Sequence, residues 1–284
     1  MKKTRKPCLP APWYPRDPVE LMNFLDPFAR IEPAGDIPAA VAPHAGWRYS
    51  GVPAAKAAAA LAAEPADTVA VIGGHLPGGA KPLFAMEDSC LTPLGEMEID
   101  AELRDLVKDS LDGQEDVWAD NTVEVLLPIV KRFFPAAKLL WARFPAELSS
   151  FEAGKTLAKA ALSLGRRVKV LGSTDLTHYG SAYGFSPRGS GPGALEWVKT
   201  VNDRRFIEAV IDGNPRDILD RAERERAACS AGAVLGALGF AEETAGKNRP
   251  AGRLLDYRTS ADLTGDPGDS FVGYMAFLFW NDFR

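Results

Sequence analysis

The chain has 284 residues, of which 46% are hydrophobic and 25% are charged, and its formal net charge is −5. These values are ordinary for a globular protein and exclude a disordered chain, a collagen and a coiled coil. There is no apolar run of the roughly 18 residues that a membrane helix needs, no basic cluster typical of a nucleic-acid-binding surface, and no apolar core of a signal peptide after the basic start. We therefore expect a cytoplasmic protein with neither a membrane nor a nucleic-acid partner.

Proline-rich residues 7–16 predict an extended arm, and Asp17 with Pro18 has the pattern of a helix N-cap followed by a first-turn proline. Farther along, short apolar runs indicate buried strands, and longer runs with apolar residues on one face indicate helices. The expected strands cover residues 37–42, 68–72, 138–142, 168–171, 253–259 and 271–280. The expected helices cover residues 53–63, 101–111, 123–134, 150–164, 195–211, 215–227 and 229–238, with loops at 184–193 (mobile) and 241–252.

Strands that alternate with helices in this way predict an α/β fold, layered as α/β/α around a mostly parallel or mixed central sheet. The sequence has no internal repeat and no linker that would divide it. We therefore expect residues 1–284 to form a single domain.

The chain contains only three histidines, His44, His75 and His178, and each follows a short apolar run that predicts a buried strand. Ligands of open α/β sheets bind beyond the carboxyl ends of the strands, so one edge of the sheet could collect all three side chains. Two neutral imidazoles suit iron, copper or zinc, and the third ligand would be a carboxylate or Cys229. Cys229 stands at the expected start of a helix, where the metal-binding thiolate is favoured.

Asp175 precedes His178 by three residues, just beyond the expected strand 168–171. A carboxylate can orient an imidazole and raise its basicity, so we predict His178 as an acid–base group and Asp175 as its catalytic partner. Plainer interpretations stay open at this point. Each histidine could cap a loop, Asp175 could cap a turn, and Cys229 could be a small buried hydrophobic residue.

Pieces of sequence along nearly the whole chain resemble the Memo family, also called AmmeMemoRadiSam system protein B. The two most specific pieces are Pro43-His44-Ala45-Gly46 and Ser173-Thr174-Asp175-Leu176-Thr177-His178-Tyr179-Gly180. The other matching pieces are Trp13-Tyr14-Pro15, Gly73-Gly74-His75, Thr92-Pro93-Leu94-Gly95, Glu124 with Pro128, Cys229, and Asp269-Ser270-Phe271-Val272-Gly273-Tyr274.

The resemblance implies a fold similar to the LigB-like class III extradiol dioxygenases, non-haem iron enzymes in which two histidines and a carboxylate hold iron(II). In the Memo branch a cysteine takes the place of the carboxylate. The implied metal ligands are therefore His44, His75 and Cys229, with Asp175 and His178 lining the pocket. Asn121 stands where the family usually has a histidine, and an asparagine does not shuttle a proton near neutral pH.

Three functions compete. In the first, an oxidoreductase of the dioxygenase-like type holds iron(II) or copper, with zinc as a further candidate, and binds a small molecule; a thiolate ligand shifts the preference toward copper(I) or zinc. In the second, the same pocket recognises a peptide or a partner protein without turnover. The aromatic and cationic rim would then be Trp13, Tyr14, Trp47, Arg48 and Tyr49. In the third, Cys229 is a nucleophile activated by His178.

Overall fold

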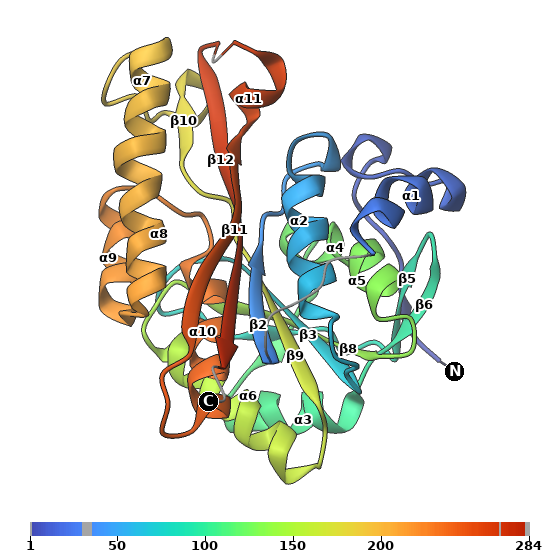
Figure 1. The fold of residues 1–284 in the computed structure, drawn as a ribbon. Helices are drawn as coiled ribbons and strands as arrows, with labels where there is room; N and C mark the ends of the chain where they lie inside the picture. Colours follow the sequence, from blue (N-terminus) through green and yellow to red (C-terminus); the bar gives the residue numbers. More distant parts are fainter. Residues whose placement is uncertain (1, 30–35, 267, 282–284) are drawn as a thin grey trace.

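A computed structural model describes residues 2–29, 36–266 and 268–281 of the chain. Its main feature is a mixed central sheet of nine strands with helices on both faces (Figure 1). In sheet order the strands are β10 (His178–Gly180), β12 (Ser270–Asn281), β2 (Asp36–Ala42), β9 (Val168–Ser173), β3 (Thr68–Leu76), β8 (Lys138–Pro145), β4 (Leu83–Phe84) and β7 (Gln114–Glu115), and β11 (Ala251–Thr259) also pairs with β12. The expected layered α/β fold is confirmed.

The centre of the sheet is parallel and antiparallel pairs flank it. Strands β2, β9, β3 and β8 run parallel to one another, whereas β12 is antiparallel to β2, β10 and β11, and β4 is antiparallel to β8 but parallel to β7. Parallel strands are covered on both faces, so they appear in sequence as nearly continuous apolar runs. Their side chains alternate between two cores: Ala70 and Ile72 of β3 enter one core, and Val69 and Val71 enter the other.

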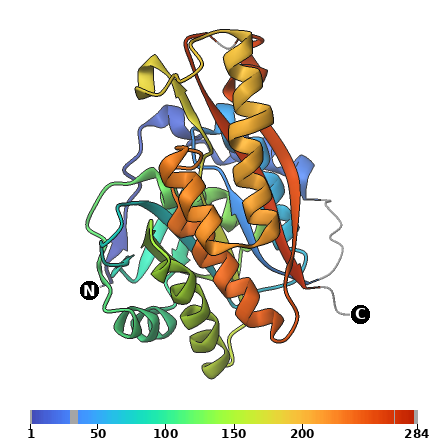
Figure 2. The ribbon, with the colours of Figure 1, turned by 90° about the vertical axis from the view of Figure 1, so that its left-hand side faces the viewer.

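Helices close each core from outside. The first core is covered by α3 (Ala101–Ser110), α6 (Ser149–Ser163), α8 (Asp203–Asp212), α9 (Pro215–Arg224) and α10 (Ala231–Ala245). Figure 2 turns α8, α9 and α10, drawn in gold and orange, toward the viewer. The second core is covered by α1 (Pro18–Leu25), α2 (Trp47–Leu61), α4 (Asn121–Glu124) and α5 (Leu127–Phe133). No helix in the described part of the chain has the length and apolar character to cross a membrane.

Several expected boundaries are wrong, each for a local reason. Helix α2 begins at Trp47 rather than 53, and Pro53 lies inside it. The expected helix 123–134 is two helices, because Pro128 lacks the N–H that a continuous helix requires and instead stands in the first turn of α5. Helix α10 continues to Ala245, into the expected loop 241–252. The expected N-cap at Asp17 is confirmed, since its side chain accepts from two backbone N–H groups of α1.

Other elements have no counterpart in the expectation. Short strands β1 (Thr4–Arg5), β5 (Ser89–Thr92) and β6 (Gly95–Glu98) form a separate three-stranded sheet. The expected helix 195–211 is divided into α7 (Pro192–Trp197), a π-helical turn η4 (Val198–Asn202) and α8. The remaining short elements are the 3-10 turns η1 (Ala11–Trp13), η2 (Asp26–Phe28) and η3 (Ser181–Tyr183), and α11 (Ser260–Thr264).

Candidate metal centre

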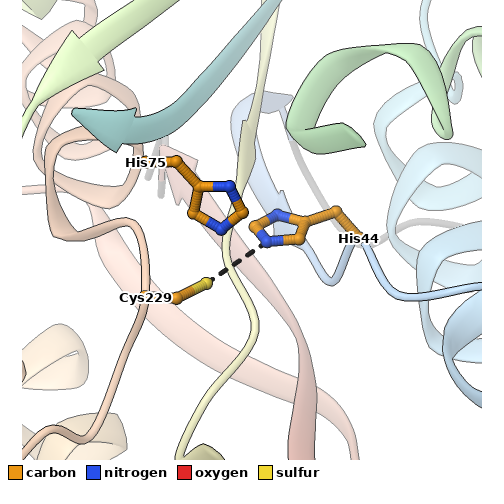
Figure 3. Close-up of side chains that lie close together, drawn as sticks. All are labelled: His44, His75 and Cys229. Carbon is orange, nitrogen blue, oxygen red and sulfur yellow. Dashed lines mark hydrogen bonds between the residues drawn. The ribbon is translucent and has the colours of Figure 1, made fainter. Parts of the chain in front are cut away.

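Two histidines and one cysteine from distant parts of the chain meet at one point (Figure 3). The candidate ligand atoms of His44, His75 and Cys229 all lie within 4.8 Å of one another. The Cys229 Sγ atom is 3.2 Å from His44 Nε2, and the two imidazole rings are perpendicular with centroids 4.9 Å apart. Among the described residues, this is the group of histidine, cysteine and acidic side chains that could hold a metal ion.

The sheet topology explains why these side chains meet. His44 follows the carboxyl end of β2, and His75 is the next-to-last residue of β3. Only β9 separates these two strands in the sheet. Cys229 lies two residues before α10, which packs across the same strands. The expectation that His75 follows its strand needs a small correction, because β3 extends to Leu76 and includes it.

The Gly73-Gly74-His75 sequence has a steric reason. A Cβ atom at Gly73 would lie closer than 3.0 Å to the Thr122 hydroxyl, and a Cβ at Gly74 would lie equally close to Ser230, beside Cys229. Only glycine lets the end of β3 approach both loops this closely. His75 itself has φ of 57°, a left-handed conformation that is uncommon for a residue with a side chain and concentrates at functional sites.

Each imidazole is oriented through its Nδ1 atom. His44 Nδ1 is 2.8 Å from Ser173 Oγ at the end of β9, and His75 Nδ1 is 3.1 Å from Asp120 Oδ2. An ionised carboxylate can only accept, so the Nδ1 of His75 donates its proton to Asp120. Burial lowers the pKa of His75, but the bonds with Asp120 and Cys229 outweigh it and raise the pKa to about 10, so a metal at Nε2 would displace a proton. Histidines that bind metals are usually held in this way. The Nε2 atoms of both rings point toward Cys229 (Figure 3).

The carboxylate behind His75 is held firmly in turn. Asp120 accepts the Thr122 N–H at 2.9 Å as the N-cap of α4, and its Oδ2 lies 3.3 Å from the guanidinium of buried Arg143. Arg143 also donates to the Gly74 carbonyl at 3.0 Å. Burial raises the pKa of Asp120, but the bonds from His75 and Thr122 and the charge of Arg143 outweigh it and hold the pKa well below its usual range.

The surroundings of Cys229 favour the thiolate, the form of cysteine that binds metals. Burial alone would raise its pKa, but the charge of His44 and hydrogen bonds with His44 and His75 outweigh burial and leave the pKa well below that of an ordinary thiol. Conversely, burial lowers the pKa of His44, and the charges of Cys229 and Asp175 more than compensate, so that pKa is raised. The lowered pKa of Cys229 and the raised pKa of His44 favour a thiolate paired with a protonated histidine, whose proton a metal would displace.

Asp175 and His178 lie beside this group but outside it. Asp175 is buried, and its Oδ1 accepts the backbone N–H of His44 at 2.7 Å. Its Oδ2 is 3.7 Å from His178 Nε2. Burial lowers the pKa of His178, but the contact with Asp175 and the charge of Cys229 raise it overall. One face of the His178 ring stacks on Tyr183, with centroids 4.9 Å apart and planes 21° from parallel.

A cavity of about 810 Å³ opens over the two histidines, within the usual size of small-molecule sites. Residues of α2 and the N-terminal arm line it on one side, and the first residues of β12 with residues of α11 and η3 line it on the other. Its aromatic and polar wall consists of Trp13, Tyr49, Tyr183, Phe271, Tyr274, Asn121, Asp175, His178, Ser260, Thr264, Asp266 and Ser270.

The expected aromatic rim is only partly correct. Trp13 and Tyr49 line the cavity, but Tyr14 and Trp47 are buried in the second core. Tyr14 donates its hydroxyl to Glu124 at 3.0 Å, and Trp47 donates its ring N–H to the Val125 carbonyl at 3.0 Å. Both aromatic rings therefore stabilise the fold and offer no surface to a ligand.

Glu124 anchors the N-terminal arm and is not part of the metal-binding group. Its carboxylate accepts the backbone N–H groups of Cys8 and Leu9 and the Cys8 thiol, at 2.8, 3.0 and 2.7 Å. These bonds place the arm so that Pro12 and Trp13 reach the cavity. Sequence reasoning missed this role, as it missed Asp120, Ser173 and Arg143, because each acts on a residue far away in the chain.

Comparisons with known proteins concern the family of the chain. A family profile described as "Memo-like protein" matches residues 5–278. A MEMO1 family protein of Methanococcoides burtonii is 31% identical over 249 residues, covering 86% of each chain. A second MEMO1 family protein, from Pyrococcus abyssi, is 30% identical over 292 residues, covering 96% of this chain and 98% of the relative.

A solved structure of an uncharacterized Escherichia coli K12 protein matches with a TM-score of 0.46 at 12% identity, covering 86% of this chain and 100% of that chain. This distant likeness decides nothing about function. The family profile and the full-length relatives do decide the family: the chain belongs to the Memo family.

Proposed function

We propose that His44, His75 and Cys229 hold one metal ion and that the adjoining cavity binds a small aromatic molecule for redox chemistry of the dioxygenase-like type. Iron(II) and copper are the candidate metals, with zinc as a third. The observation that carries the proposal is the geometry of the ligand atoms, which lie within 4.8 Å of one another while the opposite nitrogen of each ring is bonded to Ser173 or Asp120.

The donor set fits a transition metal. Two ligands on one tetrahedral ion lie about 3.3–3.8 Å apart when the bonds are about 2.0–2.3 Å long. The 3.2 Å separation of Cys229 Sγ and His44 Nε2 needs only a small adjustment to reach that value. Imidazoles suit iron, copper and zinc, and the thiolate favours the softer of these ions. Three protein ligands leave room for a further ligand from the cavity, where the bound metal would supply Lewis-acid or redox chemistry.

The residues around the cavity have separate roles. Its aromatic side chains favour a planar ligand, and among the described residues that line it none is a lysine or an arginine. This lining supports an uncharged aromatic molecule over a phosphorylated or acidic one. Asn121 does not transfer protons, because an amide does not titrate near neutral pH. Its NH₂ group donates to the His44 carbonyl at 3.0 Å and holds that backbone.

Proton transfer in the cavity is therefore assigned to His178. It is the one histidine of the chain outside the ligand group, and Asp175 lies 3.7 Å from its Nε2. Asp175 also holds the backbone of His44, so one carboxylate sets the position of the proton-transfer group relative to the metal ligands. The stack on Tyr183 fixes the plane of the His178 ring.

The test is metal analysis of the protein purified without a histidine tag, followed by oxygen consumption with a panel of catechols and other aromatic compounds. One metal per chain, lost in His44→Ala and Cys229→Ala, and oxygen uptake that His178→Gln abolishes without metal loss support the proposal. Substoichiometric metal after titration with iron(II), copper and zinc contradicts it. Stoichiometric metal without oxygen consumption favours the second candidate, a module that binds a peptide or a partner protein. Asn121 supports this candidate, because its amide cannot transfer protons.

A further inference from the structure

A π-helical turn between α7 and α8 is hydrogen-bonded to the segment that carries His178. In this turn, η4, the N–H of Asp203 donates to the carbonyl of Val198, five residues earlier. Such turns are rare in proteins and occur frequently at functional sites. Successive residues of a regular helix point about 100° apart, yet here Asn202 and Asp203 are both buried and both contact Thr177, the residue before His178.

Asn202 connects two segments of the site. Its amide donates to the Thr177 hydroxyl at 2.8 Å and to the Glu225 carbonyl at 3.0 Å. Thr177 precedes His178, and Glu225 begins the loop that leads to Cys229. Both N–H groups of this single buried side chain are thus used to hold the two segments that carry the proton-transfer group and the thiolate.

Asp203 forms the remaining side-chain hydrogen bonds to Thr177. Its Oδ1 accepts the Thr177 N–H at 3.1 Å and also the Thr177 hydroxyl, while its Oδ2 accepts the Tyr257 hydroxyl at 2.8 Å. Gly273 allows this approach, because a Cβ there would lie closer than 3.0 Å to Asp203 Oδ2. The Gly273 N–H donates in addition to the Thr177 carbonyl at 3.1 Å, so every polar group of Thr177 is engaged.

We infer that Asn202 and Asp203 are positioning residues, and that the π-helical turn exists to direct both of them at Thr177 and so to fix the His178 ring on Tyr183, beside Asp175. The inference rests on the proposed function for the role of His178. It does not depend on metal binding, because all of the contacts that carry it lie within the protein.

The test uses the fact that the chain has only three histidines. In metal-free protein labelled at histidine, NMR spectra should contain three sets of ring signals, and His178→Gln identifies one of them. Stacking on Tyr183 displaces the His178 ring signals by ring current. We expect Asn202→Ala to remove most of this displacement and to broaden the signals, whereas Asp203→Asn, which keeps an oxygen facing Thr177, should retain it.

Tyr257→Phe is the matched control, because it removes the other hydrogen bond of Asp203 and leaves Thr177 untouched. Unchanged His178 signals in Asn202→Ala would overturn the inference, as would an equal loss in Tyr257→Phe. If Asn202→Ala does not fold, Thr177→Val, which keeps the side-chain shape and removes the hydroxyl, is measured instead with the same two outcomes. Failure of the wild-type protein to bind metal would contradict the proposed function, but the NMR comparison of the variants could still be interpreted because it uses metal-free protein.

Discussion

The substitution Asp120→Asn separates the metal-binding role of His75 from the stability of the fold. The asparagine keeps one oxygen, which can continue to cap α4 through the Thr122 N–H. Its NH₂ group then faces His75 Nδ1, from which Asp120 Oδ2 now accepts a hydrogen bond at 3.1 Å. Because an NH₂ group only donates, it favours the neutral tautomer with the proton on Nε2, and in that tautomer Nε2 has no lone pair for a metal.

Loss of such an outer partner typically lowers metal affinity by about 10- to 100-fold, which corresponds to about 1.4–2.7 kcal/mol. We expect the upper part of this range, since Asp120 is also paired with buried Arg143 and its carboxylate charge is removed from a partly desolvated site. The assay is competitive zinc titration against a chromophoric chelator, with ¹⁵N NMR of the imidazoles to report the tautomer of His75.

Asp112→Asn is the control, because Asp112 is an exposed carboxylate paired with Lys81 and the substitution makes the same change in charge. It should leave zinc affinity unchanged. The reasoning is refuted if Asp120→Asn folds, binds zinc with wild-type affinity and keeps the His75 proton on Nδ1, since the carboxylate would then have no part in orienting the ring.

Two further substitutions test the packing and the electrostatics around the site. Gly74→Ala places a methyl group against Ser230, so we expect a loss of about 1–3 kcal/mol in the free energy of unfolding and weaker metal binding through displacement of Cys229. Urea unfolding measures the first effect and zinc titration the second. The control is Gly193→Ala, whose methyl group meets nothing within 4 Å and which should change neither quantity. Burial raises the pKa of Asp203 from 3.8 to about 6 despite its hydrogen bonds, so the native state binds this proton more tightly than the unfolded chain, and the contribution of Asp203 to stability should fall by about 3 kcal/mol as the pH rises from about 4 to about 6. Asp203→Asn should flatten this dependence in urea unfolding curves, and an equal slope in both proteins would show that Asp203 is not its source.

The layers of the fold could be predicted because buried parallel strands and amphipathic helices have distinct patterns. The strands at 37–42, 138–142 and 168–171 are found within a few residues of their expected bounds. The small sheet of β1, β5 and β6 was missed because its strands have two to four residues, too few for an alternation to be visible. The π-helical turn could not be predicted, since it depends on tertiary bonds from Asn202 and Asp203 rather than on local sequence.

The proximity of His44 and His75 could be predicted from sequence for a different reason, whereas Cys229 was singled out over a carboxylate as the third candidate ligand only by the family resemblance. Histidines that follow buried strands must gather at one edge of a parallel sheet, whatever the details of the loops. The residues that orient them carry no such signal. Asp120, for example, lies 45 residues after His75 in the chain, and it reaches His75 Nδ1 because Gly73 lets β3 approach α4. The direction in which an aromatic side chain points is also not visible in the sequence. Tyr14 was therefore expected on the rim of the cavity, but it lies in the core.

The most direct measurement is titration of the tag-free protein with cobalt(II), whose bond to a thiolate gives an intense near-ultraviolet absorption. The account predicts saturation at one equivalent, a thiolate band that is absent in Cys229→Ala, and a reduced affinity in His44→Ala and His75→Ala. Binding that does not saturate at one equivalent, or a spectrum that is the same with and without Cys229, would contradict a metal centre at this site.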